Sequence, residues 1–155
     1  MKFSLRTLLI GFTLVSVSLG SFTAYRHLWV RHCESLEPSL YRFIIANQIE
    51  ECGTIKSFAF GHPADTEWTQ PTAKMMAKIN LNGIDAVQVL SNKDAVCFVQ
   101  NVRWIDWNTV SIDFGTCQSN LESEGYEGAT CSFTGGEWAI QDFDTVWSAG
   151  GVACH

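Results

Sequence analysis

The stretch LLIGFTLVSVSLGSFTAY, from Leu8 to Tyr25, contains eighteen consecutive residues without a charge. As an α-helix it would be about 27 Å long at about 1.5 Å per residue, which just spans the hydrocarbon core of a bilayer. A helix buried in a small soluble domain usually has a polar side. Here the only polar groups are Ser and Thr hydroxyls, which can bond back to the helix backbone. The stretch therefore predicts a transmembrane helix.

Two alternatives follow for this stretch, an uncleaved anchor and a cleaved signal peptide. Lys2 and Arg6 precede it and Arg26 and Arg31 follow it, and together with the free amine they favour a cytoplasmic N-terminus. A secretory signal peptide has the same charged start, and residues 18–20 (Ser-Leu-Gly) would serve as its cleavage site.

The uncleaved anchor is the preferred interpretation, because the apolar character continues beyond Gly20. Phe22 and Tyr25 extend it to Trp29 and Val30, as in a helix with an interfacial aromatic belt. We therefore expect a single-pass membrane protein with its C-terminal domain outside the cytoplasm. The protein would be secreted if it is cleaved near Gly20.

The opening residues KFSLRTLL, at positions 2–9, resemble the start of a large group of uncharacterised bacterial proteins. Proteins of that group begin with (K/R)FSLRTLL, continue into one hydrophobic segment and then carry a small exported domain. The resemblance covers about the first 25 residues and implies this topology, but no activity.

The charge is divided between two segments, which we interpret as an anchor with its linker (residues 1–32) and one exported domain (residues 33–155). The first segment has four basic residues and no acid, and the second has six basic and 16 acidic residues, a formal −10. About 120 residues suffice for one domain with a real core. Such an acidic domain would repel nucleic acid and anionic lipid, whereas cations and basic proteins remain suitable partners.

Six cysteines follow the membrane stretch, and an oxidising envelope would allow them to form disulfides. They are Cys33, Cys52, Cys97, Cys117, Cys131 and Cys154. Cys117 and Cys131 bracket one predicted loop and are the favoured pair, although six cysteines allow fifteen pairings. Buried free thiols are the alternative. Zinc is a weaker one, because there is no C-x-x-C and no Cys/His cluster at ligand spacing.

Hydrophobic periodicity predicts one further helix and a meander of strands. The helix runs from about Leu36 to Cys52, with Pro38 in its first turn. The expected strands cover residues 55–60, 77–81, 84–90, 95–100, 110–114, 130–134 and 137–147. Asn82-Gly83 suits a type I′ turn that would make a hairpin of the second and third strands. A polar loop is expected at residues 118–128 and a turn at Gly135-Gly136.

The last strand contains four large apolar residues whose spacing does not fit a regular strand. Trp138 and Ile140 share one face, whereas Phe143 and Trp147 lie an odd number of residues further along. One bulge near Asp142 would turn all four toward the core.

Together these elements predict an α+β domain in which one helix packs on a curved antiparallel β-sheet of five to seven strands. The closing segment GGEWAIQDFDTVW, residues 135–147, resembles the last strands of cystatin-like and NTF2-like domains. The NTF2 pattern usually has more helices than the single early one here.

No motif is specific enough to name a reaction, so every candidate site has a structural alternative. His62 beside Asp65 would suit acid–base chemistry, but Pro63 makes the segment a surface turn. Two carboxylate pairs would suit a catalytic cavity, and equally a solvated surface. They are Asp142 with Asp144, and Asp106 with Asp113.

Two further patterns point to binding. Asn120-x-Glu122-x-Glu124-Gly125 imitates half of a calcium loop, but Cys131 stands where the closing acid is needed. An acidic solvated loop is the preferred interpretation.

Trp104 and Trp107 cannot share a face of a regular strand, so one of them is a candidate exposed residue beside Phe98. Packing in the core, or a bulge, is the structural alternative.

We therefore expect a non-enzymatic binding module in the cell envelope, held to the membrane by the stretch from Leu8 to Tyr25, that binds a protein or small ligand. No catalytic residue, cofactor or metal site is assigned. The alternative is a small NTF2-like enzyme with Asp106, Asp113, Asp142 or His62 as its base in an apolar pocket. A third, weaker hypothesis is metal binding by Cys or Glu groups.

Overall fold

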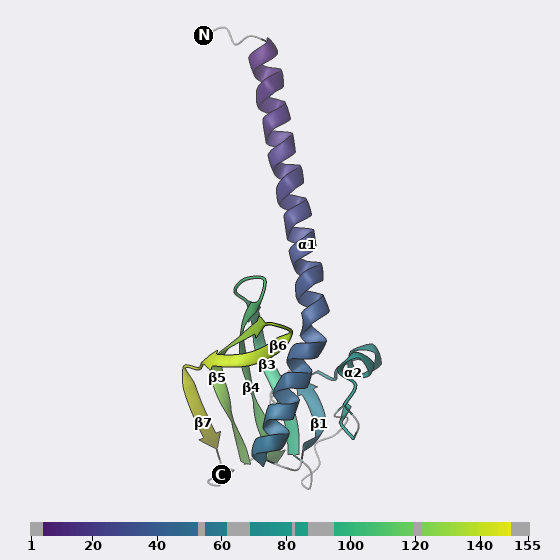
Figure 1. Ribbon diagram of the computed structural model, residues 1–155, viewed down its shortest axis with the longest axis vertical. Helices are drawn as coiled ribbons and strands as arrows, with labels where there is room; N and C mark the ends of the chain where they lie inside the picture. The colour runs from purple at the N-terminus through teal and green to yellow at the C-terminus, as the bar shows by residue number, and fades with distance from the viewer. Residues whose placement is uncertain are drawn as a thin grey trace. The chain divides into compact units, whose positions relative to one another are not determined.

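The predicted membrane stretch forms part of a 48-residue helix, α1 (Leu5–Cys52), in the computed structural model of the chain (Figure 1). The structure describes residues 5–52, 55–61, 69–81, 83–86, 95–119 and 122–149. The chain forms two compact units, residues 1–35 and residues 36–155, and each is described by itself.

In the first unit, the apolar part of α1 is exposed along its length. The most apolar window of the helix has none of its residues buried, and by length and composition the helix could cross a membrane. Its hydroxyls bond back to the helix as expected, because Thr13 and Thr23 donate to the carbonyls of Leu9 and Leu19, at 2.9 Å each. Such bonds leave the outside of the helix apolar, as a lipid environment requires.

The second predicted helix is not separate, because α1 continues without interruption to Cys52. Pro38 lies inside the helix, where it removes one backbone hydrogen bond at a cost of about 3 kcal/mol. Packing compensates for this cost, since Leu40, Ile44 and Ile45 are fully buried within the next two turns. The predicted end of the helix is confirmed, but its predicted start near Leu36 is wrong.

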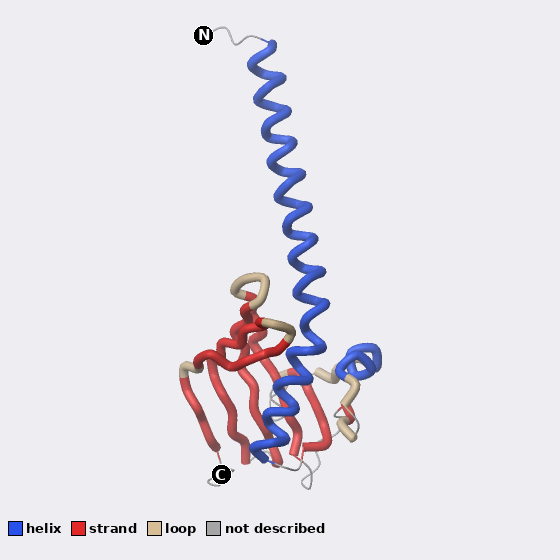
Figure 2. The backbone as a smooth tube through the Cα atoms, viewed as in Figure 1, coloured by secondary structure: helices blue, strands red, loops and turns tan. Residues whose placement is uncertain are grey.

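The second unit is built on a seven-stranded sheet (Figure 2). The strands are β1 (Ile55–Phe60), β2 (Asp85–Ala86), β3 (Ala95–Trp104), β4 (Thr109–Ser119), β5 (Glu122–Thr134), β6 (Glu137–Asp142) and β7 (Thr145–Ala149). Their order is β2-β1-β3-β4-β5-β6, and β7 also pairs with β5. The α+β class is confirmed. The sheet is mixed rather than antiparallel, because β1 is parallel to both β2 and β3.

The predicted hairpin across Asn82-Gly83 is wrong, because its first strand is a helix, α2 (Ala73–Ile79). The Thr72 hydroxyl caps its start by accepting from the Met75 N–H at 3.2 Å, and Asn80 ends it in a left-handed conformation with φ 50°. Met75, Met76 and Ile79 have helical spacing, which outweighs the alternation seen in the sequence. Of the predicted return strand, 85–86 form β2 and 87–90 lie outside the described residues.

Arg42 joins the two helices. Its Nε donates to the carbonyl of Ile79 at 2.7 Å and its Nη2 donates to that of Lys78 at 3.1 Å. These are two of the carbonyls that a helix C-terminus leaves unpaired, and a cation is favourable there.

Most of the remaining strand predictions hold, with two exceptions: the loop at residues 118–128, and the last strand at residues 137–147, which is divided into β6 and β7. Strands at residues 95–100, 110–114 and 130–134 and the Gly135-Gly136 turn are confirmed. The loop predicted at residues 118–128 is wrong, because β4 continues to Ser119 and β5 begins at Glu122. Polar residues and glycine in this segment occupy paired strands rather than a loop.

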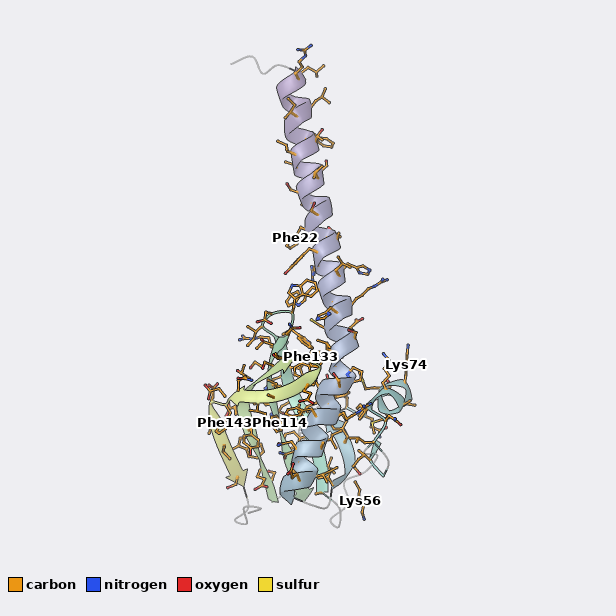
Figure 3. All side chains as sticks on the ribbon, viewed as in Figure 1. Phe22, Lys56, Lys74, Phe114, Phe133 and Phe143 are labelled. Atoms are coloured by element: carbon orange, nitrogen blue, oxygen red, sulfur yellow. The ribbon has the colours of Figure 1, made fainter. Side chains whose placement is uncertain are left out.

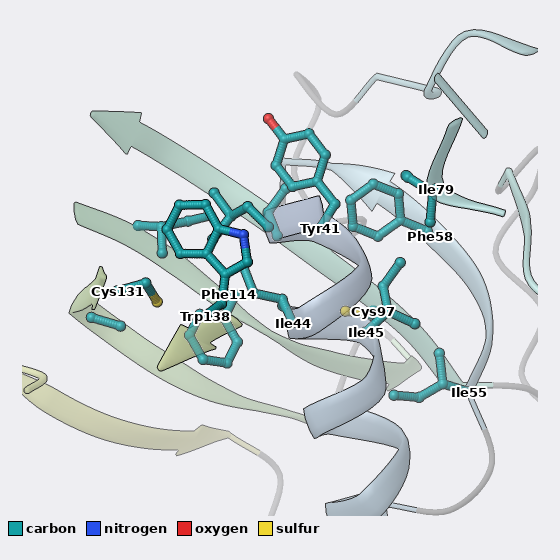
Figure 4. Close-up of a cluster of buried hydrophobic side chains, with 14 of the residues drawn as sticks. Tyr41, Ile44, Ile45, Ile55, Phe58, Ile79, Cys97, Phe114, Cys131 and Trp138 are labelled. Carbon is teal, nitrogen blue, oxygen red and sulfur yellow. The ribbon is translucent and has the colours of Figure 1, made fainter. Parts of the chain in front are cut away.

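The core lies between the C-terminal part of α1 and one face of the sheet (Figure 4). Each central strand contributes buried side chains, which include Phe58, Cys97, Val99, Val110, Ile112, Phe114, Ala129, Cys131 and Trp138. The indole of Trp138 donates to the Ser39 hydroxyl at 2.9 Å, so β6 is hydrogen-bonded directly to the helix.

Three bulges occur at neighbouring positions across the sheet. The extra residue lies at residues 101–102 in β3, at residues 127–128 in β5 and at Gln141 in β6. Asn101 and Gly128 have positive φ, 51° and 66°, within the first two. A bulge bends and twists its strand. Figure 2 shows the result, since β6 runs at a steep angle to β7.

Each bulge also inverts the alternation of side chains along its strand: beyond the extra residue, positions that would have faced solvent face the core, and the reverse. In β3 the core residues change from Cys97 and Val99 to Val102 and Trp104. In β5 they change from Tyr126 to Ala129 and Cys131, as the register of that strand shifts. Core residues therefore face the helix on both sides of the bend.

The bulge predicted near Asp142 is confirmed, but it does not turn all four large residues inward. The ring of Phe143 lies 5.3 Å from that of Tyr126, on the helix side of the sheet. A second interruption at residues 143–144 separates β6 from β7. Beyond it, Trp147 is directly opposite Gly125 and its ring lies 6.1 Å from that of Phe98, on the other face.

Two glycines make this second contact geometrically feasible. Phe98, Gly115, Gly125 and Trp147 follow one another across four strands, so the two rings meet above the glycines. A Cβ on Gly115 would lie 2.1 Å from the Glu124 carbonyl oxygen and 2.7 Å from the Gly125 Cα. Only glycine fits this approach of β4 to β5.

Gly115→Ala should therefore destabilise the domain. We expect a loss of about 2–3 kcal/mol in the free energy of unfolding, the upper part of the range for overpacking, because backbone atoms must move. Urea denaturation followed by tryptophan fluorescence would measure it.

Ser148→Ala, an exposed change in β7, is the control and should alter the free energy by less than about 0.5 kcal/mol. Equal stability of the Gly115 variant and this control would contradict the close approach.

Candidate functional site

The carboxylates singled out from the sequence are distributed differently from the two predicted pairs. Asp106 lies at the tip of the β3–β4 hairpin, whereas Asp113 is paired with Gln100 on the far side of the β3 bulge. The Asp106 N–H donates to the Thr109 carbonyl at the start of β4, and Asp113 is four residues further along that strand, or about 13 Å at about 3.3 Å per residue. The structure does not bring this pair together.

Asp113 has a structural position between two bulges. Its Oδ2 accepts from the Asn101 amide at 2.6 Å, and its Oδ1 accepts from the Gly128 N–H at 2.8 Å. One carboxylate thus satisfies donors from β3 and β5, each of which belongs to a bulged segment. Both oxygens are engaged, which is the arrangement of a structural anchor.

Asp106 closes the tip of its hairpin. Its Oδ1 accepts from the Asn108 N–H at 2.8 Å. The pKa of Asp106 is lowered, first by that backbone hydrogen bond and then by one from the Thr109 side chain. A general base needs a pKa nearer neutrality, so the carboxylate fits a turn better than a catalytic role.

Asp142 and Asp144 flank the interruption between β6 and β7. The Asp142 carboxylate accepts from the N–H of Phe143 at 2.9 Å. The Asp144 carboxylate lies beside Gly128, where a Cβ would be only 2.1 Å from its Oδ2. Asp144 and Asp113 therefore approach the same glycine, a neighbourhood created by the bulge that periodicity could not predict.

The remaining predicted ligands do not form a site among the described residues. His62, Asp65 and Asn120 lie outside them. Glu124 and Gly125 are in β5 rather than in a calcium loop. In the part of the chain that the structure describes, no group of three or more His, Cys, Asp or Glu side chains could hold a metal ion.

The favoured disulfide is wrong. No disulfide joins the described cysteines, Cys33, Cys97, Cys117 and Cys131. Cys117 is directly opposite Ser123 and Cys131 is directly opposite Val110, so the two cysteines are separated by about 23 Å along the strands at about 3.3 Å per residue. A disulfide requires Cα atoms less than about 7 Å apart.

Two other residues with shifted pKa values, Cys131 and Tyr41, lie in the core. Burial raises the pKa of the Cys131 thiol to about 11. Burial, and then the charge of Glu37, raises the pKa of the Tyr41 phenol. The Tyr41 ring packs against Phe58 and Phe60 at 5.7 and 5.3 Å. These shifts result from packing and give no indication of a reactive centre.

Of the two tryptophans in the β3–β4 hairpin, Trp107 is the exposed one. Its side chain is 36% exposed and the neighbouring Ile105 is 51% exposed. Trp104 packs 6.0 Å from Trp138. The predicted neighbour Phe98 is fully buried and contacts Trp147 instead, so it forms no surface with Trp107.

The most distinctive surface lies at the β6–β7 margin of the sheet. Phe143 and Val146 are 44% and 57% exposed there, and Asp142 and Asp144 are exposed beside them. We call these four residues, together with the exposed Glu127 of β5, the acidic edge. Glu127 is directly opposite Thr145 in β7, which places it in the strand next to the margin.

Basic residues are distributed unevenly in the second unit. No Lys or Arg occurs in the sequence after Arg103, whereas eight acids do. Lys56 is on β1, and Lys74 and Lys78 are on α2. Figure 3 shows Lys56 and Lys74 on the side of β1 and α2, away from Phe143. The acidic edge therefore has no basic residue nearby in the sequence to neutralise it.

Comparison with protein-family models, with curated proteins and with solved structures finds no match for the chain. The site must therefore be interpreted from its own geometry.

Asp113→Ala should destabilise the domain by about 1–3 kcal/mol, because it leaves the Gly128 N–H and the Asn101 amide without their acceptor. Denaturation of the purified full-length protein in neutral detergent would measure the change.

Glu137→Ala, which removes an exposed acid in β6, is the control and should be nearly neutral. A stable Asp113→Ala protein would show that the carboxylate does not anchor the bulges.

Proposed function

We propose that the chain is a single-pass membrane protein whose C-terminal domain lies outside the cytoplasm and acts there as a non-enzymatic binding module. The exposed apolar part of α1 supports membrane anchoring, because exposure of that much apolar surface to water would be very unfavourable. The flanking basic residues favour a cytoplasmic N-terminus.

The acidic edge is the observation that supports binding. It combines two exposed apolar side chains, Phe143 and Val146, with carboxylates from a part of the sequence, after Arg103, that has no Lys or Arg. Apolar groups surrounded by charges of one sign are typical of a recognition surface, since burial supplies affinity and charge selects the partner. The partner that fits this surface is a basic protein segment.

The alternative of an NTF2-like enzyme has less support. Asp113 uses both carboxylate oxygens to hold bulges, Asp106 closes a hairpin tip and Asp142 caps the adjacent backbone. Each of these three candidate bases holds a different part of the backbone. His62, the fourth, lies outside the described residues.

Proteolysis from outside tests the topology. In spheroplasts that express the full-length chain with a C-terminal epitope tag, added proteinase K should remove the tag. A cytoplasmic protein should survive until the cells are lysed. Protection of the tag in intact spheroplasts would contradict the proposed topology, and mass spectrometry of the same protein would show any cleavage near Gly20.

Binding by charge is tested with fluorescent hexalysine and the full-length protein in neutral detergent. Binding should weaken about three- to tenfold in the double variant Asp142→Asn/Asp144→Asn, as expected for two exposed ion pairs. It should also weaken with added salt. Fluorescence anisotropy would measure both effects.

The control removes two exposed acids from α1, Glu34→Gln/Glu50→Gln, and so has the same net charge as the double variant. It should bind hexalysine as the unchanged protein does. Equal weakening in both double variants would mean that net charge, and not the acidic edge, attracts the probe.

A further inference from the structure

The strand at the acidic edge has an unoccupied side in the described structure. Among the described strands β7 pairs with β5 alone, so the N–H and C=O groups on its other side meet no described strand. At the opposite margin of the sheet, β2 has only two residues. In Figure 1, β7 lies at the margin farthest from β1 and α2. An edge of this kind is a template for an added strand.

We infer that β7 accepts an extended segment of a partner protein as an additional strand, and that this segment alternates apolar and basic residues. The inference rests on the proposed binding function and specifies its partner. Main-chain hydrogen bonds to β7 would supply affinity, and the side chains beside β7 would supply selectivity.

The apolar positions of the segment would meet the helix-facing side of β7. Val146 is directly opposite Tyr126, and the Phe143 ring packs 5.3 Å from the Tyr126 ring, so all three side chains lie on that side. Phe143 and Val146 are the exposed members. Cross-strand pairs with aromatic or β-branched residues are the stabilising contacts between neighbouring strands.

Charge determines which extended segments fit. Asp142 ends β6, Asp144 directly precedes β7, and Glu127 lies in the adjacent strand β5. Lys or Arg on an added strand would pair with these carboxylates. A second copy of this chain would instead bring its own Asp142 and Asp144 to the edge, and like charges on neighbouring strands are destabilising. The acidic edge thus favours a basic partner over self-association.

The test compares short peptides on the full-length protein in neutral detergent. An alternating Lys-Val octapeptide should bind at least about tenfold more tightly than hexalysine, because it adds main-chain and apolar contacts. A version with N-methylated amides at every second residue, which cannot complete a ladder, should lose that gain. Hydrogen exchange should show protection of the β7 amides by the unmodified peptide only.

Protein variants localise the effect. Val146→Lys places on β7 a charged residue of the kind that prevents natural edge strands from pairing with another strand. It should weaken octapeptide binding about tenfold or more. Ile105→Lys makes the same chemical change at the hairpin tip, where the side chain is 51% exposed, and should leave binding within about twofold. Thermal unfolding would verify that both variants are folded.

The outcomes separate the two proposals. If the octapeptide binds no better than hexalysine, or if N-methylation and Val146→Lys have no effect, strand addition is wrong while binding by charge stands. If neither peptide depends on the acidic edge, both proposals fail. Dimerisation of the protein through β7, detected by light scattering and abolished by Val146→Lys, would assign the edge to a second copy instead.

Discussion

The second unit depends on a sheet that bends so that its strands keep one apolar face against the C-terminal part of α1. Bulges in β3, β5 and β6 produce the bend, and Asp113 in β4 lies between the first two. Its carboxylate accepts one hydrogen bond from each side, from Asn101 and from Gly128. β4, which has no extra residue at Asp113, thus holds the two bulged segments in register. Without these bonds, two polar donors at the bend would have to find other partners.

The bend has consequences on the other face of the sheet. Where β4 and β5 approach closely at Gly115 and Gly125, the rings of Phe98 and Trp147 meet and form a small apolar layer opposite the main core. The contact with Phe98 holds Trp147, and with it β7, in place. Val146, the residue before Trp147, therefore faces the other side of the sheet, where it is exposed. The packing that stabilises the margin of the sheet therefore also presents the apolar residues of the acidic edge.

Sequence periodicity predicted the elements whose side chains alternate or repeat regularly. Examples are the apolar run of α1 and the strands around Val99 and Ile112. The Gly135-Gly136 turn was predicted from its residue types instead. The segment from Ala77 to Leu81 was mistaken for a strand because a helix of seven residues shows too few turns to reveal its period. Its true signals were local, the Thr72 cap and the pair Met75 and Ile79. They competed with an Asn-Gly turn signal; the chain does turn there, with the Ile84 N–H donating to the Leu81 carbonyl at 3.4 Å, but the turn follows a helix and does not join two strands.

The predicted carboxylate pairs show a second limit of prediction from sequence. Sequence spacing paired Asp142 with Asp144 and Asp106 with Asp113, because residues two apart, or on adjacent strands, lie close together in regular strands. Bulges change both register and facing, and one extra residue in each of several strands was enough to bring Asp144 and Asp113 to the same glycine. A glycine inside a polar strand segment, such as Gly128, is the sequence signal that could have indicated a bulge, because glycine readily takes the positive φ found there. The sequence does not show which strand such a bulge faces, because that depends on tertiary structure.

The uneven distribution of charge gives the second unit an acidic part that contains the acidic edge. The described basic side chains lie on α1, β1, α2 and β3, and the strands after Arg103 carry acids but no Lys or Arg. In a soluble protein that tumbles freely, such a distribution mainly steers the encounter with a charged partner. In a domain tethered to a membrane, rotation is restricted, so the same distribution would also determine which partners can reach the acidic edge. Anionic head groups would repel that edge, because they have the same charge, and would leave it accessible to basic segments in solution.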